Sequence, residues 1–272
     1  MTNIQKKYFM NKFGLEYHLV DSCNLRCAGC SHYSSLLDKL TYTPLDKIIK
    51  EMSILKLKTN HGTSLKWLRL LGGEPLLHPE LAECIKIIRG YFTETRITLV
   101  TNGLLLDKMP DRFYEECKDS KVEIQVTNYG IIDIDAIFDY IKAKNISIEV
   151  YRTCKSWYYR NIRLTDGDID CFKNCYHKSM CPNYRNGKIF LCPQMAYIDI
   201  FNNCFNKNIS INSDEYIDIS DIRNFDDLVT ALTTLHPTFC SKYCNCVDSN
   251  GNPSALGQRH TTQKNINEFC EL

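Results

Sequence analysis

The sequence has no apolar run of about 18 residues, the length that a membrane-spanning helix needs. Residues 1–8 contain no apolar core of the kind found in signal peptides, so we expect a cytoplasmic protein that does not enter a membrane. The net charge is also nearly absent, because 33 Lys and Arg against 32 Asp and Glu give +1. A chain without a field of one sign is a poor general binder of polyanions, which argues against a nucleic-acid partner. There is no internal repeat and no low-complexity segment.

Cysteine, in contrast, is abundant, with 15 among 272 residues. Without a signal peptide, this abundance indicates metal ligation or redox chemistry rather than disulfides, and an odd number cannot pair completely. Eleven cysteines fall into three groups: Cys23, Cys27 and Cys30; Cys171, Cys175, Cys181, Cys192 and Cys204; and Cys240, Cys244 and Cys246. The others stand apart: Cys84, Cys117, Cys154 and Cys270. Cys84 and Cys117 lie in helical patterns, where we expect small buried residues.

The first 150 residues alternate between strand and helix patterns, in a chain whose 44% hydrophobic and 24% charged residues are typical of a packed protein. Five strands are expected, at residues 16–21, 65–71, 96–101, 121–126 and 146–150. Four helices are expected between them, at residues 45–57, 78–91, 110–117 and 134–144. This alternation indicates right-handed crossovers and a parallel sheet, and therefore the α/β class. Ligands of such sheets bind at the carboxyl ends of the strands, where the unusual residues of this half lie.

After residue 157, glycine-marked turns, cysteines and short apolar stretches replace this alternation. We expect a strand or hairpin at 209–219, a helix at 224–235 and a tight turn at Asn186-Gly187. A domain boundary is expected near residue 155. The first domain would be a core at 1–155, and 156–272 would hold the remaining core strand and a cysteine-rich domain.

Cys23, Cys27 and Cys30 can converge on one centre from a single loop. A structural zinc site takes four ligands, so this triad would need a distant fourth residue. A [4Fe–4S] cluster has four irons, and three cysteines leave one iron open to chelate a substrate and deliver an electron to it. A zinc knuckle and a redox dithiol remain as alternatives.

The spacing Cys-x3-Cys-x2-Cys after the first strand of a parallel β/α chain resembles the signature of radical S-adenosylmethionine (radical SAM) enzymes. Gly72, Gly73, Glu74 and Pro75 resemble the Gly-Gly-Glu-Pro motif of that family, which receives the amino group of the SAM methionine. Paired glycines suit close approach of a ligand to the backbone. The resemblance covers about residues 16–153 and implies a partial (β/α)6 barrel, whose sixth strand the sequence does not place.

Further SAM contacts are expected at the ends of the third and fourth strands. Thr101 and Asn102 resemble the family's segment that lines the SAM pocket, and Thr127 and Asn128 are candidate contacts to ribose or carboxylate, with an ordinary turn as the alternative.

The residue before the third cysteine departs from the family pattern. It is often aromatic there and packs by the adenine, whereas this chain has Gly29. Either His32 and Tyr33 take over that packing, or Gly29 serves through its backbone.

The later cysteines resemble the SPASM or shorter twitch extension of radical SAM enzymes, in which Cys-x(9–15)-Gly-x4-Cys precedes a further pair. Gly187-x4-Cys192 fits this pattern. The resemblance implies one auxiliary [4Fe–4S] cluster with candidate ligands Cys175, Cys181, Cys192, Cys240 and Cys244. Because the last cysteines follow Cys-x3-Cys-x-Cys rather than Cys-x2-Cys, Cys171 and Cys246 stay open as ligands, and a structural zinc site is the alternative.

The resemblance implies reductive cleavage of SAM to methionine and a 5′-deoxyadenosyl radical, which takes a hydrogen atom from a substrate. It also implies a flavodoxin- or ferredoxin-type electron donor. We expect a small polar, carbohydrate-like substrate that undergoes oxidation or rearrangement. Arg152, after the fifth strand, would bind a substrate oxygen or phosphate, unless it is a salt-bridged surface residue.

Three other functions compete with this expectation. A ribosomal peptide is the alternative substrate, although enzymes of that kind usually carry an N-terminal leader-binding domain and only 15 residues precede the first strand here. A non-catalytic zinc or iron–sulfur binding module is the alternative from a different class. A glycyl-radical activase would have the triad, but its usual ferredoxin-like spacing is missing from the second cysteine set.

Overall fold

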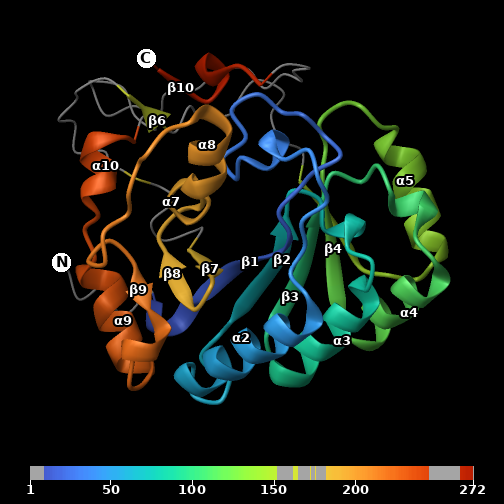
Figure 1. Ribbon diagram of the computed structural model, residues 1–272. Helices are drawn as coiled ribbons and strands as arrows, with labels where there is room; N and C mark the ends of the chain where they lie inside the picture. The colour runs from blue at the N-terminus through green and yellow to red at the C-terminus, as the bar shows by residue number, and fades with distance from the viewer. Residues whose placement is uncertain are drawn as a thin grey trace.

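The fold is built on one mixed sheet, and helices pack against the part of this sheet that its parallel strands form (Figure 1). The computed structural model describes residues 9–151, 162–164, 172, 175, 182–244 and 264–271. The strands are β1 (Gly14–Val20), β2 (Trp67–Gly72), β3 (Arg96–Thr101), β4 (Val122–Thr127), β5 (Ile148–Tyr151), β7 (Asn183–Arg185), β8 (Lys188–Phe190) and β9 (Ile217–Asp218). Their order in the sheet is β5-β4-β3-β2-β1-β7-β8-β9, which places β1 in the interior of the sheet.

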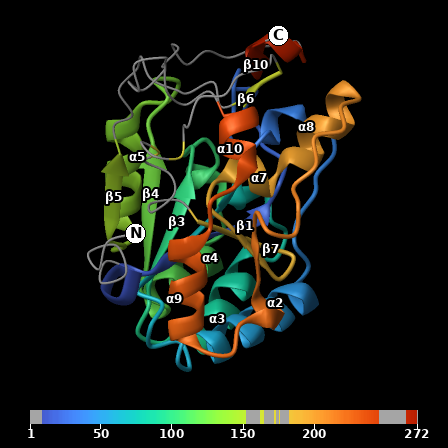
Figure 2. The same cartoon turned by 90° about the vertical axis from the view of Figure 1, so that its left-hand side faces the viewer.

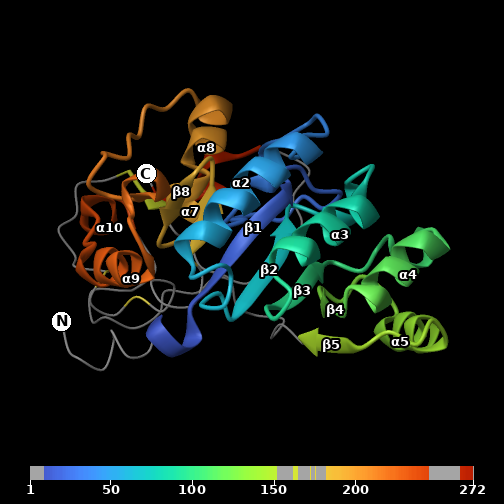
Figure 3. The same cartoon turned by 90° about the horizontal axis from the view of Figure 1, so that it is seen from below.

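Strands β1 to β5 are parallel, as the strand–helix alternation predicts. The connecting helices are α2 (Leu45–Lys58), α3 (Leu81–Tyr91), α4 (Asp111–Asp119) and α5 (Ile134–Ala143), and Figure 3 shows them side by side along the sheet. Their apolar faces join the buried strand residues in one hydrophobic core, and all seven residues of β1 are buried. Cys84 and Cys117 are part of this core, which confirms the prediction made for them.

The predicted elements of the first half are all present, with small differences at their ends. The helix predicted from residue 78 starts at Leu81, because Pro75–Leu77 forms a separate 3-10 helix, η2. The helix predicted at 224–235 is α9 (Phe225–Thr234). The strand or hairpin predicted at 209–219 is reduced to the two residues of β9. In the segment before it, the N–H of Glu215 donates to the Asn212 carbonyl and the N–H of Asn212 donates to the Glu215 carboxylate, which closes a turn.

The strand beside β1 comes from the second half of the chain. β7 runs parallel to β1, with Glu16 opposite Asn183, and therefore lies on the other side of β1 from β2 and β5. β7 and β8 form an antiparallel hairpin around the predicted turn. Asn186 and Gly187 both have positive φ, 54° and 76°, which a two-residue hairpin turn of this kind requires.

A second hydrophobic core joins the end of the chain to the loop after β1. It contains residues of η1 (Ser34–Leu36), α7 (Pro193–Ala196), α8 (Ile198–Phe205), α10 (Thr238–Lys242) and the small parallel sheet of β6 (Ile162–Arg163) and β10 (Cys270–Glu271). We call it the annex core. Figures 1 and 2 show α8, β6 and β10 at the same end of the molecule. Within the described ranges, no helix is long and apolar enough to cross a membrane.

Candidate functional site

The candidate site lies where the carboxyl ends of β1, β2 and β3 meet. The loop after β1 carries the three clustered cysteines, β2 runs into the Gly-Gly-Glu-Pro segment, and β3 ends at Thr101. The structure therefore brings together the sequence motifs that were predicted to share one edge of the sheet.

Gly72 and Gly73 allow the backbone at the end of β2 to lie directly against the backbone that precedes Cys23. The N–H of Gly73 donates to the carbonyl of Val20 at 2.8 Å, and the N–H of Glu74 donates to the carbonyl of Ser22 at 3.0 Å. A Cβ on Gly73 would lie 2.1 Å from the Ser22 carbonyl oxygen. The glycines thus allow close contact between two segments of the backbone, and not only between backbone and ligand. This contact fixes the start of the cysteine loop.

Glu74 is fully buried and connects the ends of β2 and β3. Its carboxylate accepts hydrogen bonds from the Thr101 hydroxyl (2.6 Å), the Asn102 N–H (2.9 Å) and the Leu76 N–H (3.1 Å). Burial raises the pKa of Glu74 to about 7, although these three donors act in the opposite direction. The chain fills three of the about four acceptor positions of this carboxylate, and the predicted role of the segment in receiving the SAM amino group stays a prediction. Pro75 is buried and begins η2.

Asn102 extends this network to the cysteine loop. Its side-chain amide donates to the Asn24 side chain at 2.7 Å and lies 3.9 Å from the Cys23 sulfur, while its oxygen accepts from the Leu104 N–H. The buried carboxylate of Glu74 is thereby joined through Asn102 to Cys23. Thr101 and Asn102 thus lie where the sequence predicts, with contacts to the chain itself.

The three clustered cysteines lie in a setting that suits sulfur ligands. The Cys23 sulfur accepts from the Leu25 N–H at 3.3 Å, and the Cys30 sulfur accepts from backbone N–H groups of residues 32–35. Burial raises the pKa of Cys23, and the neighbouring Cys30 and Cys27 thiols raise it further, so both of these cysteines lie near Cys23. Backbone donors aimed at sulfur stabilise the negative charge of a cluster-bound thiolate.

Among the residues that the structure describes, no three His, Cys, Asp or Glu side chains converge closely enough to hold a single metal ion. In a cubic cluster each cysteine binds a different iron, so the ligand sulfurs need not meet at one ion. The choice between zinc and a cluster in the triad therefore stays a prediction.

The remaining predicted residues of the first half are less well connected to this site. Thr127 ends β4, and the Asn128 side chain accepts from the Gly130 N–H at 2.8 Å, which is the ordinary turn that the sequence left as an alternative. Arg152 lies outside the described residues.

The described cysteines of the second half gather near the annex core. The Cys192 sulfur accepts from the N–H groups of Gln194 and Met195, and burial raises its pKa to about 12, with a further contribution from Cys175. Cys240 lies in α10 and Cys244 two residues after its end. Cys171, Cys181 and Cys246 lie outside the described residues, so their predicted or open roles as ligands stay predictions.

Tyr33, the candidate for packing beside the adenine, lies in the annex core. Its ring is 2% exposed and packs in the annex core, with ring centroids 5.5 Å from Phe201 and 6.4 Å from Phe269. Burial raises its pKa well above the usual value, and Cys192, Cys270, Cys30 and Cys244 add to this effect. The predicted adenine contact of Tyr33 stays a prediction. Cys270 was set apart by sequence spacing, and only tertiary structure brings it here.

Residues 17–145 match the Radical SAM superfamily. These residues form a radical SAM domain. It runs from β1 to the end of α5 and contains the cysteine triad, Glu74 and Asn102.

Curated relatives match parts of this chain. The chain is 36% identical over 103 residues to GTP 3′,8-cyclase from Microcystis aeruginosa, covering 37% of this chain and 30% of that protein. It is 30% identical over 154 residues to GTP 3′,8-cyclase from Synechocystis sp., covering 55% of this chain and 40% of that protein. The chain therefore matches less than half the length of these relatives.

A solved structure extends the likeness beyond the radical SAM domain. The crystal structure of BtrN in complex with AdoMet and 2-DOIA superposes with a TM-score of 0.54 at 16% identity, covering 91% of this chain and 100% of that chain. At this identity the likeness concerns the fold. The predicted α/β class with a partial radical SAM barrel is confirmed.

Sequence reasoning missed a polar stack beside the cysteine loop of the radical SAM domain. The buried His18 on β1 hydrogen-bonds to Asp21 through Nδ1 at 2.8 Å and to His32 through Nε2 at 2.7 Å. Its ring stacks on Tyr197 with centroids 3.7 Å apart, and the Arg185 guanidinium lies over the same tyrosine at 4.6 Å. Burial lowers the pKa of His18, despite the opposing effect of Asp21. The alternation of β1 indicated a strand but not that a polar side chain on it is buried.

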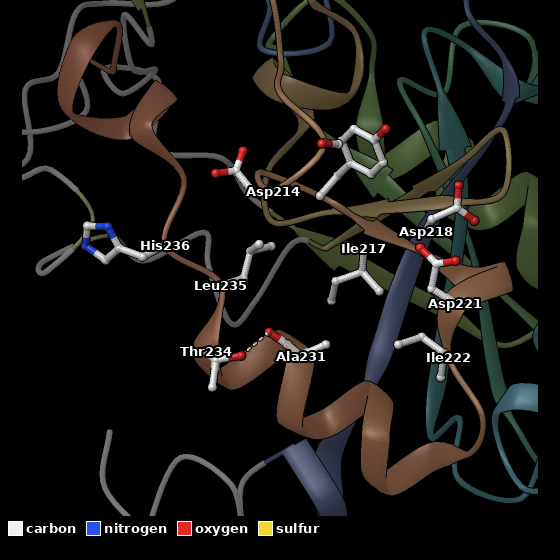
Figure 4. A pocket seen from close by; sticks show the side chains of 11 residues that line it. Asp214, Ile217, Asp218, Asp221, Ile222, Ala231, Thr234, Leu235 and His236 are labelled. Carbon is white, nitrogen blue, oxygen red and sulfur yellow. Dashed lines mark hydrogen bonds between the residues drawn. The ribbon is translucent and has the colours of Figure 1, made fainter.

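A hollow of about 470 Å³ lies apart from the predicted site, between β9, η4 (Ile219–Asp221) and α9. Figure 4 shows Asp214, Asp218 and Asp221 around it, with His236 at its far side. None of the predicted site residues lines this hollow, and the Asp218 carboxylate is occupied by the N–H and hydroxyl of Ser220.

Proposed function

We propose that the chain is a radical SAM enzyme that cleaves SAM reductively at a [4Fe–4S] cluster held by Cys23, Cys27 and Cys30. It then takes a hydrogen atom from a small polar, carbohydrate-like substrate, for oxidation or rearrangement. The observation that carries the proposal is the triad in the loop after β1 of a radical SAM domain, where Cys27 and Cys30 both lie near Cys23. Such a cluster, when bound, supplies the electron that divides SAM into methionine and a 5′-deoxyadenosyl radical.

The chain's own residues fix the geometry of this site. Backbone N–H groups after Cys30 and the N–H of Leu25 stabilise thiolate charge. Glu74 and Asn102 hold the ends of β2 and β3 against the cysteine loop. These contacts would keep the three sulfurs in one arrangement to hold the cluster, whose remaining iron would be open to SAM.

The substrate class has two supports. The relatives that match the radical SAM domain are named for a reaction on GTP, a small polar molecule that contains a sugar. The hydrogen-bonded side chains of His18, Asp21 and His32 add polar groups beside the cysteine loop. We also propose a flavodoxin- or ferredoxin-type protein as the electron donor and a cytoplasmic location.

The second half is proposed as a SPASM- or twitch-like annex with an auxiliary [4Fe–4S] cluster, following a core at residues 1–155. The candidate ligands are Cys175, Cys192, Cys240 and Cys244, with Cys181 as a further candidate. Buried polar atoms without a hydrogen-bond partner, the Tyr33 hydroxyl and the Gln194 side-chain nitrogen, lie among the residues around Cys192 and support a bound group there.

Anaerobic reconstitution tests both parts of the proposal. The wild-type chain is expected to hold about eight irons with sulfide, four for each cluster, and to release 5′-deoxyadenosine from SAM when reduced. Replacing Cys23, Cys27 and Cys30 with alanine should abolish this release and leave about four irons. Cys204→Ala, at a half-buried cysteine outside both proposed ligand sets, is the matched control and should change neither value.

Substrate choice is tested by the same release assay. Stimulation by sugars, aminocyclitols or nucleotide-linked sugars supports the proposal, and stimulation by peptides alone would reverse the substrate preference. Zinc in place of iron, or undiminished release from the triple alanine variant, would contradict the function itself.

A further inference from the structure

Tyr33 occupies the junction between the cysteine loop and the annex core. It precedes η1, and its N–H donates to the Cys30 carbonyl at 3.0 Å. Its backbone adopts the left-handed conformation, with φ of 55°, which is uncommon for a bulky residue and persists only where the surroundings enforce it. The position of this side chain is therefore closely determined by the fold.

Cysteines from separate segments of the chain surround this side chain. Cys30 belongs to the triad, Cys192 follows β8, Cys244 follows α10 and Cys270 lies on β10, and all four act electrostatically on the Tyr33 hydroxyl. Cys30 and Cys192 also pack against the annex core, of which Tyr33 and Cys270 are buried members. Tyr33 therefore lies between the two proposed cluster sites.

The Tyr33 hydroxyl is buried and has no hydrogen-bond partner among the residues that the structure describes. Most buried hydroxyl groups are hydrogen-bonded, and an unpaired one costs free energy. A phenol is protonated at neutral pH and can donate one hydrogen bond. The thiolate and sulfide sulfurs of an iron–sulfur cluster are acceptors for such a donor.

We propose that the Tyr33 hydroxyl donates a hydrogen bond to a sulfur of the auxiliary cluster and raises the reduction potential of that cluster. Tyr33 is a positioning residue, and the inference rests on the auxiliary cluster of the proposed function. A donor at a cluster sulfur stabilises the additional negative charge of the reduced state, so its removal makes reduction harder. Through its backbone bond to Cys30, the same residue connects the auxiliary cluster to the SAM-binding loop.

Tyr197 provides a matched control. It is also buried in the annex core with an unpaired hydroxyl. The charges that act on it are Asp21, Arg185 and two glutamates, with no cysteine among the groups that shift its pKa. Tyr197→Phe therefore removes the same atom from the same core without removing a donor to sulfur.

The experiment is a potentiometric titration of the reconstituted full chain followed by electron paramagnetic resonance. Addition of SAM identifies the triad cluster by the change in its spectrum. Tyr33→Phe is expected to keep the iron content and circular dichroism of the wild type, because the hydroxyl it removes has no protein partner. The auxiliary signal should shift to a more negative potential and the triad signal should not, while Tyr197→Phe should shift neither.

The outcomes separate this inference from the proposed function. A wild-type chain with about eight irons and an auxiliary potential unchanged by Tyr33→Phe overturns the inference alone. An equal shift in Tyr197→Phe, or an equal shift of both clusters, overturns it as well. A wild-type chain with about four irons refutes the auxiliary cluster and with it the inference.

Discussion

At the scale of single residues, the Gly-Gly-Glu-Pro segment shows what a motif can and cannot reveal. The sequence indicates its place at a strand end and its proximity to the triad. It does not indicate that the Glu74 carboxylate is engaged by Thr101, Asn102 and Leu76, because those partners become neighbours only after β2 and β3 pair. Cys270 and His18 were missed for the same reason, since neither has a characteristic spacing.

Two glycines of the radical SAM domain should respond oppositely to alanine. A Cβ on Gly73 would lie 2.1 Å from the backbone oxygen of Ser22, which has no room to move, so Gly73→Ala should cost about 3 kcal/mol or more. A Cβ on Gly90, within α3, would meet nothing within 4 Å, so Gly90→Ala should stabilise the chain by about 0.5–1 kcal/mol. Denaturant unfolding of the two variants measures both values, and a Gly73→Ala variant of unchanged stability would contradict the packing.

At the scale of elements, periodicity predicted the strands and helices of the first half because each buries one regular face. β4 alternates buried and half-buried residues, and β3 has the predicted bounds, Arg96–Thr101. The prediction of a strand in the segment before β9 was wrong. The Glu215 carboxylate accepts hydrogen bonds from the N–H groups of Asn212 and Phe239, and these bonds form a turn instead of strand pairing. Such side-chain competition is not visible as a period.

The hairpin of β7 and β8 depends on its turn residues. Gly187 has φ of 76°, and its Cβ would meet only the Ile219 side chain at 4.0 Å, so alanine there adds backbone strain without a clash. Gly187→Ala should destabilise the chain by about 1 kcal/mol. Asn186→Gly keeps positive φ accessible at the other turn position and serves as the control, with a smaller effect. Thermal unfolding compares the two, and equal losses would argue that the turn conformation is not the cause.

At the scale of the whole molecule, the two halves of the sequence share one sheet. The change in pattern near residue 155 was visible in the sequence, but the pairing of β7 with β1 was not, because two short strands carry too little periodicity to choose a partner. Phe225 of α9 packs on Phe13, with ring centroids 5.5 Å apart, so the second half also completes the first core.

A fragment of residues 1–155 should therefore fold poorly. It would expose one edge of β1 and the face of Phe13 that α9 covers, and unpaired strand edges promote association. Size-exclusion chromatography should show aggregates, whereas the full chain treated in parallel should not aggregate in this way. A monomeric fragment with a cooperative thermal transition would show that the first half is autonomous.

The interior position of β1 also affects the order in which parts of the molecule unfold. Strands at the rim of a sheet have a bonded neighbour on one side only, and disorder on heating spreads from such places inward. β1 has bonded neighbours on both sides, β2 and β7, and the loop that begins where it ends carries the triad. We therefore expect the β1 end of the cysteine loop to lose its sheet pairing late during thermal unfolding, so that a cluster bound there would be released late.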